Sequence, residues 1–217
     1  MIKIALPKGD IQEAVGIFLA DRGIRFDAYT KDARAYASRA GGEQSLFSKQ
    51  FREKDIPIQV SIGNYDLGLC GAQWIAEYMG QYPRADILNL RTLNISEGEM
   101  CVCCSSCEPD GNTGDDLLRT MSERGPIRIA TPFPILAEEY ALKKRLPDFR
   151  IFPLWGAAEA YPPEGAELIL ICVDKETILE ENNLRIVERL FPAMASLIAN
   201  KVYFEKKDLS EALEKLI

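Results

Sequence analysis

Histidine is absent from the 217 residues of this chain. Imidazole is the commonest general base and the commonest metal ligand in proteins. Its absence excludes Ser-His-Asp and Cys-His mechanisms, and it excludes every metal site that requires an imidazole. Any chemistry must therefore use carboxylates, lysine, arginine, tyrosine, cysteine, a bound metal or the positioning of substrates alone.

The chain also lacks a long apolar run and an excess of positive charge. No stretch approaches the roughly 20 apolar residues that span a bilayer. The net charge of −7 argues against non-specific nucleic-acid binding. The N-terminus leads directly into a predicted strand and shows no signal-peptide pattern. We therefore expect a cytoplasmic globular protein that acts neither on nucleic acid nor on membranes, and its 47% hydrophobic content agrees with this class.

Disulfides are not expected in a chain of this kind, although it has six cysteines. Four of them crowd into CVCCSSC, residues 101–107. In a strand, Cys101 and Cys103 share one face and Cys104 lies on the other, so the cluster is divided. A thiolate metal site is the alternative, but no second C-x-x-C completes it. We interpret the cysteines as small side chains packed in a strand.

Glycine is missing where it would be most informative. Leu168–Val173 is a run of six apolar residues, which indicates a strand buried on both faces. A helix pattern begins after Thr177, so the turn between them occupies the position where α/β proteins bind phosphate. This turn carries Asp174, Lys175 and Glu176 in place of glycine. The position of this turn therefore favours an anion-binding site, whereas its two carboxylates and lack of glycine argue against one.

Two further strand–turn–helix segments occur earlier in the chain. Ile2–Leu6 is followed by Pro7, Lys8 and Gly9, and Asp10 has the capping-box spacing to Glu13 at the start of a predicted helix. Cys70–Gly71–Ala72 has the same organisation. Residues 55–63 are ambiguous, because their alternation suggests a strand whereas Asp55, Pro57 and Gly63 suit a capped helix. The alternation of strands and helices predicts an α/β protein with mostly parallel sheet.

Several segments, taken in order, resemble the catalytic subunit of ATP phosphoribosyltransferase, the first enzyme of histidine biosynthesis. The opening strand and turn are IALPKG, and the next matches are DIP followed by DLGLCG. The later matches are IRIAT, the Gly156–Glu159 segment and ASLIAN. In order, these segments are residues 4–9, 55–57, 66–71, 127–131, 156–159 and 195–200. The resemblance covers nearly the whole chain, and it favours a helix at residues 55–63.

The resemblance implies two α/β domains of periplasmic-binding-protein type II-like architecture with a cleft between them. Residues 1–94 and 184–217 would form the first domain, and residues 95–183 would form the second, which carries the sugar-phosphate loop. The chain length resembles the short form of the family. That form is an oligomer that works with a regulatory subunit related to histidyl-tRNA synthetase.

The family reaction implied for this chain moves the phosphoribosyl group of phosphoribosyl pyrophosphate (PRPP) to N1 of ATP and releases pyrophosphate. Mg²⁺ would be bound to the substrate, and no metal would be held by protein ligands alone. Positioning and electrostatic stabilisation carry such chemistry without histidine. The expected site has catalytic carboxylates and a set of substrate-binding residues. We expect the former to be Glu159 and Asp174, and the latter to be Lys8, Gly9, Arg34, Arg52, Gly68, Gly71, Lys175 and Thr177.

The turn after residue 173 departs from the family pattern D-x-V-x-T-G-x-T-L. Lys175–Glu176 replaces the Thr-Gly pair, and Ile171 and Ile178 replace the acidic residue and the second threonine. Asp10 stands where the family usually has arginine. The alternative hypothesis is therefore a non-catalytic protein on the same fold that binds a nucleotide or another metabolite. For each candidate charge, including Lys175 beside Glu176, the simpler interpretation is a solvated surface side chain.

Overall fold

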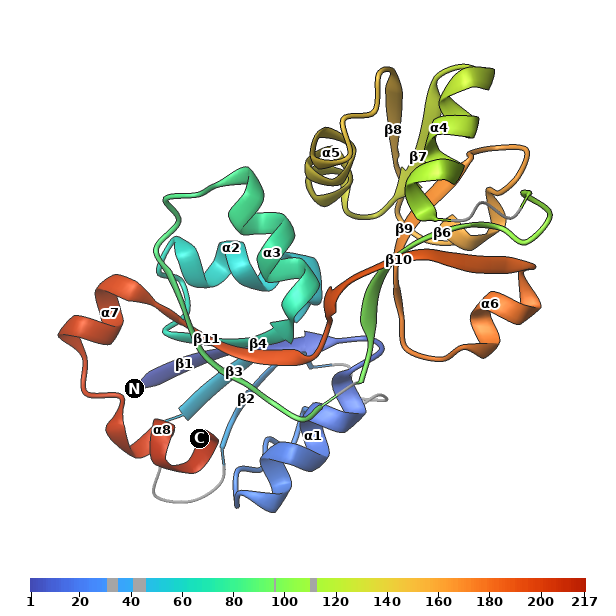
Figure 1. Ribbon diagram of the computed structural model, residues 1–217. Helices are drawn as coiled ribbons and strands as arrows, with labels where there is room; N and C mark the ends of the chain where they lie inside the picture. Colours follow the sequence, from blue (N-terminus) through green and yellow to red (C-terminus); the bar gives the residue numbers. More distant parts are fainter. Residues whose placement is uncertain (31–34, 41–45, 96, 110–112) are drawn as a thin grey trace. The chain divides into compact units, whose positions relative to one another are not determined.

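The computed structural model describes residues 1–30, 35–40, 46–95, 97–109 and 113–217 (Figure 1). The chain divides into two compact units, which are described separately. Unit 1 is Met1–Ser96 with Met194–Ile217, and unit 2 is Glu97–Ala193. The return to the first unit therefore falls after Ala193, whereas the expected boundary was residue 184. The difference arises because the strand that follows Leu184 pairs within unit 2.

Unit 1 is built on a six-stranded sheet of order β2-β3-β1-β4-β11-β5. β1 runs parallel to both β3 and β4. The antiparallel pairs are β2 with β3, and β11 with both β4 and β5. The strands are β1 (Ile2–Lys8), β2 (Ala37–Arg39), β3 (Leu46–Arg52), β4 (Leu67–Gly71), β5 (Ile87–Thr92) and β11 (Ala195–Asn200). The sheet is thus mixed around a parallel centre, and the prediction of a mostly parallel sheet is wrong at its edges.

Helices cover both faces of this sheet (Figure 1). One buried cluster joins α1 and α8 to the strands, and a second joins α2 and α3 to the opposite face. The helices are α1 (Gln12–Asp21), α2 (Ile56–Ser61), α3 (Ala72–Gln81), α7 (Lys201–Lys206) and α8 (Ser210–Leu216), with the 3-10 turn η1 (Glu53–Asp55) before α2. Burial of one such aliphatic side chain contributes about 1.5–3 kcal/mol, so the two clusters hold the layers together.

Local sequence patterns predicted the position of helix α2 correctly but gave the wrong capping residue for helix α1. Helix α2 begins at Ile56 with Pro57 in its first turn, and Gly63 has a φ of 77°, so the helix prediction for residues 55–63 is confirmed. The capping role predicted for Asp10 is wrong, because α1 begins at Gln12 without a side-chain cap. The register of the strand–turn–helix connection places Asp10 outside the cap position.

Unit 2 contains a five-stranded sheet of order β10-β6-β9-β7-β8. β7 is parallel to β8 and β9, whereas β6 is antiparallel to β9 and β10. The strands are β6 (Glu99–Ser105), β7 (Ile127–Thr131), β8 (Phe149–Pro153), β9 (Leu168–Val173) and β10 (Leu184–Pro192). The helices are α4 (Gly114–Arg124), α5 (Pro134–Lys143) and α6 (Thr177–Glu181), with the 3-10 turn η2 (Ala158–Ala160). Strand β10 has no counterpart in the sequence-based prediction.

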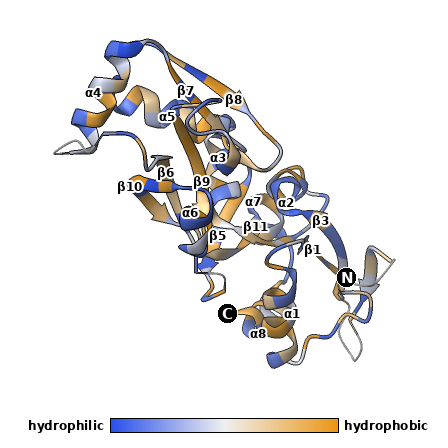
Figure 2. Cartoon of the chain, turned by 90° about the vertical axis from the view of Figure 1, so that its right-hand side faces the viewer, coloured by the Kyte–Doolittle hydropathy of each residue, from blue (hydrophilic) through white to orange (hydrophobic). Residues whose placement is uncertain are grey.

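The strand predicted at residues 168–173 is confirmed as β9, which lies between β6 and β7 and is almost wholly buried. In Figure 2 the region of β9 is coloured as hydrophobic, whereas β10 carries hydrophilic segments. Cys101 and Cys103 of β6 pack in one cluster with Ile169 and Ile171 of β9. Cys101, Cys103 and Cys104 are all buried in β6, which confirms the interpretation of these three thiols as packed side chains. For Cys107 the interpretation is wrong, because this residue lies beyond the end of β6 and is exposed.

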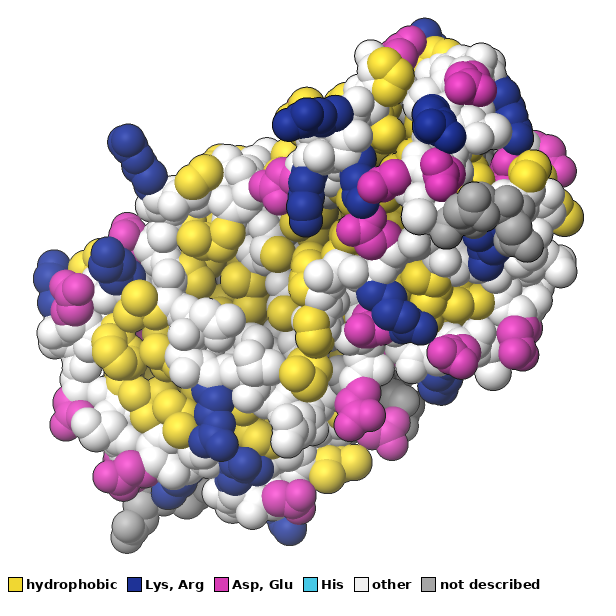
Figure 3. Space-filling model, in the orientation of Figure 1, with side chains coloured by type: hydrophobic (Ala, Val, Ile, Leu, Met, Phe, Trp, Pro, Cys, Tyr) yellow, Lys and Arg dark blue, Asp and Glu magenta, His cyan; other side chains and the backbone are white. Residues whose placement is uncertain are grey.

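The surface carries both signs of charge. In the face shown by Figure 3, lysine and arginine side chains are interspersed with aspartate and glutamate. Helix α4, with 11 residues, is the longest of the described helices, and none of the described helices is both long and apolar enough to cross a membrane.

Candidate functional site

In unit 1, the candidate residues gather at the carboxyl ends of three neighbouring strands. Lys8 ends β1, Arg52 ends β3 and Gly71 ends β4. Lys8 and Arg52 are partners in the β1–β3 register, so the two side chains start side by side on adjacent strands. This edge is where α/β sheets bind ligands. Arg34, the remaining charged candidate of unit 1, lies outside the described residues.

The turn after β1 exposes its lysine and needs its glycine. Lys8 Nζ lies 3.3 Å from the hydroxyl of Tyr36 and 4.5 Å from the centroid of its ring. Gly9 has a φ of 117°, a conformation that side chains strongly disfavour. The Gly9 carbonyl accepts a hydrogen bond from the backbone N–H of Gln12 at 3.1 Å. The turn is therefore closed by backbone contacts while the lysine remains at the surface.

A half-buried carboxyl group that the sequence reasoning missed lies at the same edge. Glu53 follows Arg52 directly, and its Oε2 accepts the backbone N–H of Gly71 at 3.0 Å. Burial raises the pKa of Glu53 from 4.5 to about 7, with a smaller contribution from Asp10 in the same direction, while the hydrogen bond from Gly71 opposes the rise. The signal was available in principle, because a charged residue next to the end of a strand in a parallel-centred sheet falls at this edge.

The two candidate glycines of β4 lie in different surroundings. A Cβ on Gly68 would be 2.8 Å from side-chain atoms of both Ile56 and Val60 in α2, so the packing of that helix alone explains this glycine. Gly71 precedes α3, and the amide of Gln73 folds back over its Cα. Gln73 is buried, and its Oε1 has no hydrogen-bond partner among the described residues. An unpaired buried acceptor therefore lies beside the Gly71 end of β4.

In unit 2, the turn after β9 carries the other candidates. Asp174, Lys175 and Thr177 are exposed, and α6 begins at Thr177, as the sequence predicted. The backbone closes the turn tightly, because the N–H of Ile178 donates to the carbonyl of Lys175 at 3.2 Å. The N–H groups of Leu179 and Glu180 both donate to the carbonyl of Glu176, at 3.0 and 3.4 Å. The turn therefore combines an exposed lysine with two exposed carboxylates.

The side chain of Glu176 points toward Arg189, a residue of β10. Its Oε1 lies 3.7 Å from Nη2 of Arg189, and the Glu176 side chain is 82% exposed. Arg189 also forms an ion pair with Glu99 of β6. At this exposure the Glu176 contact contributes at most a few tenths of a kcal/mol. It nevertheless gives Glu176 an orientation in which a cation offsets its charge.

Glu159 and an exposed tryptophan lie in the segment that follows β8. Glu159 belongs to η2, whose neighbouring Ala158 is buried. Gly156 and Ala157 have positive φ values of 152° and 52°, so the chain turns sharply before the carboxylate. Trp155, just before this turn, is 83% exposed. Large aromatic side chains are seldom this exposed, and Trp155 was absent from the sequence-based site.

The relatives named here that align by sequence share one description. A sequence profile of the family described as "HisG: ATP phosphoribosyltransferase" matches residues 52–217. An "ATP phosphoribosyltransferase" of Campylobacter curvus is 30% identical over 220 residues, covering all of this chain and 96% of that protein. Another of the same description, from Caldanaerobacter subterraneus subsp. tengcongensis, is 29% identical over 218 residues and is covered to 94%.

Solved structures resemble the fold. A chain of the "ATP phosphoribosyl transferase (HisG:HisZ) complex from Thermotoga maritima" has a TM-score of 0.77 and 24% identity, with 100% of this chain and 96% of that chain covered. The aliphatic sulphonate binding protein SsuA of Escherichia coli has a TM-score of 0.60 and 16% identity, with 99% and 70% covered. The second likeness agrees with the expected architecture related to periplasmic binding proteins.

Proposed function

The chain belongs to the ATP phosphoribosyltransferase family, and from that premise we propose that it transfers the phosphoribosyl group of PRPP to N1 of ATP. Pyrophosphate is released, and the reaction is the first step of histidine biosynthesis. The observation that carries the proposal is the family match over residues 52–217, which is joined by relatives of this name that align with the whole chain. The protein is accordingly assigned as a pentosyltransferase.

The carboxyl edge of the unit 1 sheet is proposed to bind the polyphosphate of ATP. Lys8 and Arg52 start from adjacent strands and supply two cations, and Gly9 leaves the turn open because no atom lies within 4 Å of the place its Cβ would occupy. Arg34 belongs to the same proposal. Because burial raises the pKa of Glu53 to about 7, its carboxyl group is protonated more often at neutral pH than that of an ordinary glutamate. The edge is therefore less negative than its sequence suggests.

The turn after β9 is proposed to hold the 5′-phosphate of PRPP. Lys175 and Thr177, whose side chains are exposed in the turn, are the donors that support this role. The contact between Glu176 and Arg189 supports it as well, because it keeps a carboxylate directed toward a cation. Asp174 and Glu159 are proposed to face the sugar, whose positive charge in the transition state carboxylates stabilise.

Mg²⁺ is proposed to reach the site on the pyrophosphate of PRPP. Within the described residues, no group of three or more His, Cys, Asp or Glu side chains is placed to hold a metal ion. Bound to the pyrophosphate, Mg²⁺ would neutralise the charge of the leaving group. In this proposal, the protein contributes the cations that orient the phosphates and the carboxylates that face the sugar.

A partner subunit and an oligomeric state belong to the same proposal. The related Thermotoga maritima chain was solved in a HisG:HisZ complex. We propose that this chain likewise binds a regulatory subunit related to histidyl-tRNA synthetase. Because ATP and PRPP are cytoplasmic metabolites, we place the protein in the cytoplasm.

A second candidate function is a non-catalytic protein that binds a nucleotide or another metabolite on the same fold. One observation favours it: the segment Asp174–Thr177 has no glycine, and it carries two carboxylates where a phosphate would lie. Like charges at short range cost several kcal/mol once water is removed. The two candidates differ in whether PRPP binds.

Calorimetric titration of PRPP with Mg²⁺, and of ATP separately, tests the proposal. We expect micromolar affinity for PRPP, about −8 kcal/mol, and formation of phosphoribosyl-ATP in a coupled assay with the partner subunit. Lys175→Ala should weaken PRPP binding about tenfold, as loss of a charged hydrogen bond does, whereas Lys143→Ala, an exposed lysine of α5, should leave it unchanged. Binding of ATP without binding of PRPP by the folded protein would overturn the proposal and establish the second candidate.

A further inference from the structure

Unit 2 contains a pocket at the end of its sheet opposite to the candidate turn. The pocket has a volume of about 380 Å³ and lies next to the amino ends of β7, β8 and β9. Glu167 directly precedes β9, whereas the candidate turn follows the last residue of that strand. Six residues of strand span on the order of 20 Å. The pocket is therefore separate from the proposed substrate-binding residues of unit 2.

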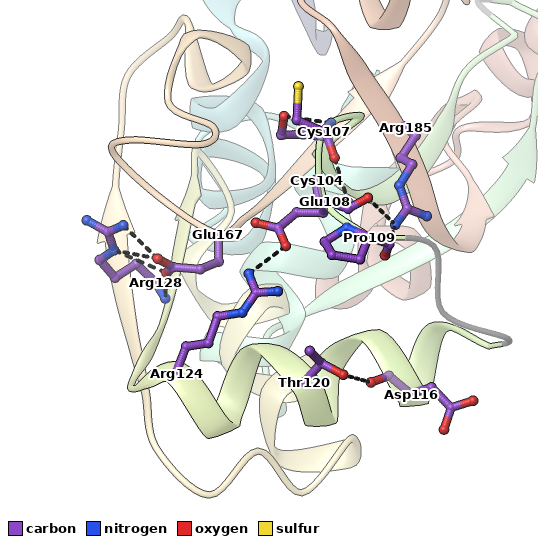
Figure 4. A network of polar contacts seen from close by, with 11 residues as sticks. Cys104, Cys107, Glu108, Pro109, Asp116, Thr120, Arg124, Arg128, Glu167 and Arg185 are labelled. Atoms are coloured by element: carbon purple, nitrogen blue, oxygen red, sulfur yellow. Dashed lines mark hydrogen bonds and ion pairs between the residues drawn. The ribbon is translucent and has the colours of Figure 1, made fainter.

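Three arginines and two glutamates line the pocket, and each glutamate is already paired. Arg128 donates several hydrogen bonds to the Glu167 carboxylate. Its Nη2 lies 2.6 Å from Oε1, and its Nε lies 3.1 Å from both carboxylate oxygens. Glu108 receives Nη1 of Arg124 at 2.8 Å. Figure 4 shows both pairs. Each carboxylate therefore holds one guanidinium group in place, and its charge is balanced by that arginine.

Arg150 is the third guanidinium of the pocket, and among the described residues it has no hydrogen-bond or ion-pair partner. It is the register partner of Arg128 on the neighbouring strand β7. Register partners on adjacent strands project to the same side of the sheet from backbones about 4.8 Å apart. Like charges in this arrangement destabilise a sheet unless an anion offsets them. The pocket thus has one positive charge more than its carboxylates balance.

We propose that this pocket binds a small metabolite through an oxyanion, a phosphate or a carboxylate group, that is held by Arg150 with Arg124 and Arg128 beside it. Guanidinium groups match both kinds of oxyanion through paired hydrogen bonds. The volume equals that of about a dozen water molecules in the liquid, so it exceeds the need of a bare phosphate ion. Pro126 and Pro163, which are exposed in the lining, offer an apolar surface for the rest of the molecule.

The test follows the reactivity of single arginines in the wild-type protein. Phenylglyoxal modifies accessible guanidinium groups, and peptide mass spectrometry measures the rate at each arginine. Arg119 is the internal control, because its side chain is 72% exposed and its contact is with Asp116 of the same helix. Inorganic phosphate and succinate are added in turn, with sodium chloride keeping the ionic strength constant.

We expect phosphate or succinate to slow modification of Arg150 about tenfold, the effect of occupying most of the sites, while the rate at Arg119 stays constant. Stronger protection by phosphate identifies a phosphorylated ligand, and stronger protection by succinate identifies a carboxylate. Equal rates at Arg150 with and without both anions would overturn the proposal.

A variant gives an independent result. Glu108→Gln removes the carboxylate that competes for Arg124, so protection of Arg150 should require about tenfold less anion, a gain that matches one charged hydrogen bond. Circular dichroism verifies that the variant is folded. If the folded variant needed the same or a higher anion concentration than the wild type, Arg124 would not share the ligand and the proposed site would be wrong.

Discussion

Replacing the half-buried Glu53 with glutamine should change how the stability of the protein depends on pH. The glutamine keeps a side-chain oxygen for the Gly71 N–H, which Glu53 accepts at 3.0 Å, and it removes the ionisable group. The pKa of Glu53 is raised from 4.5 to about 7, chiefly by burial. Ionised Glu53 is therefore less favourable in the folded protein than in the unfolded chain.

The direction follows from proton binding. Between pH 4.5 and about 7 the folded protein holds a proton on Glu53 that the unfolded chain has released. The free energy of unfolding must then decrease as the pH rises through this window. The difference of about 2.5 pKa units corresponds to roughly 3 kcal/mol lost above pH 7 and fully retained below pH 4.5. Glu53→Gln should lack this decrease and should be more stable than the wild type by up to about 3 kcal/mol at pH 8.

Urea unfolding followed by circular dichroism, at intervals between about pH 4 and pH 8, measures both proteins. Glu205→Gln is the matched control, because Glu205 is an exposed carboxylate of α7 in the same unit. The control should reproduce the wild-type dependence. If Glu53→Gln showed the same decrease as the wild type, or were the less stable protein at pH 8, the assigned burial of an uncompensated carboxylate would be refuted.

Two further predictions concern packing and ion pairs. Gly68→Ala should destabilise the protein by about 1–3 kcal/mol in urea unfolding, because its Cβ would press on Ile56 and Val60 of α2, and unchanged stability would contradict that contact. Lys144→Met should cost up to about 1 kcal/mol, since Nζ lies 2.9 Å from the exposed Asp115 and 2.8 Å from the partly exposed Glu188, whereas Lys143→Met in the same assay should cost nothing measurable.

Local sequence patterns determined the main elements that carry the candidate site. The apolar run Leu168–Val173 is a buried strand, and the helix begins at Thr177, because both features depend on short-range periodicity. Pro57 and Gly63 likewise predicted a helix at residues 55–63, where the structure has α2. The quoted motifs also predicted the family, since their order along the chain is a property of the sequence alone.

Tertiary structure decided what those patterns leave open. The orientation of Glu176 depends on Arg189, which reaches it from β10, a strand that the sequence pattern did not reveal. The protonation of Glu53 depends on how deeply the fold buries it, and burial is set by elements distant in sequence, including Gly71 at the end of β4. Arg128 forms an ion pair with Glu167, and Arg150 has no carboxylate partner among the described residues, because β7, β8 and β9 are neighbours in one sheet. Charge and burial depend on contacts between distant segments, whereas helix and strand periodicity depends on neighbours along the chain.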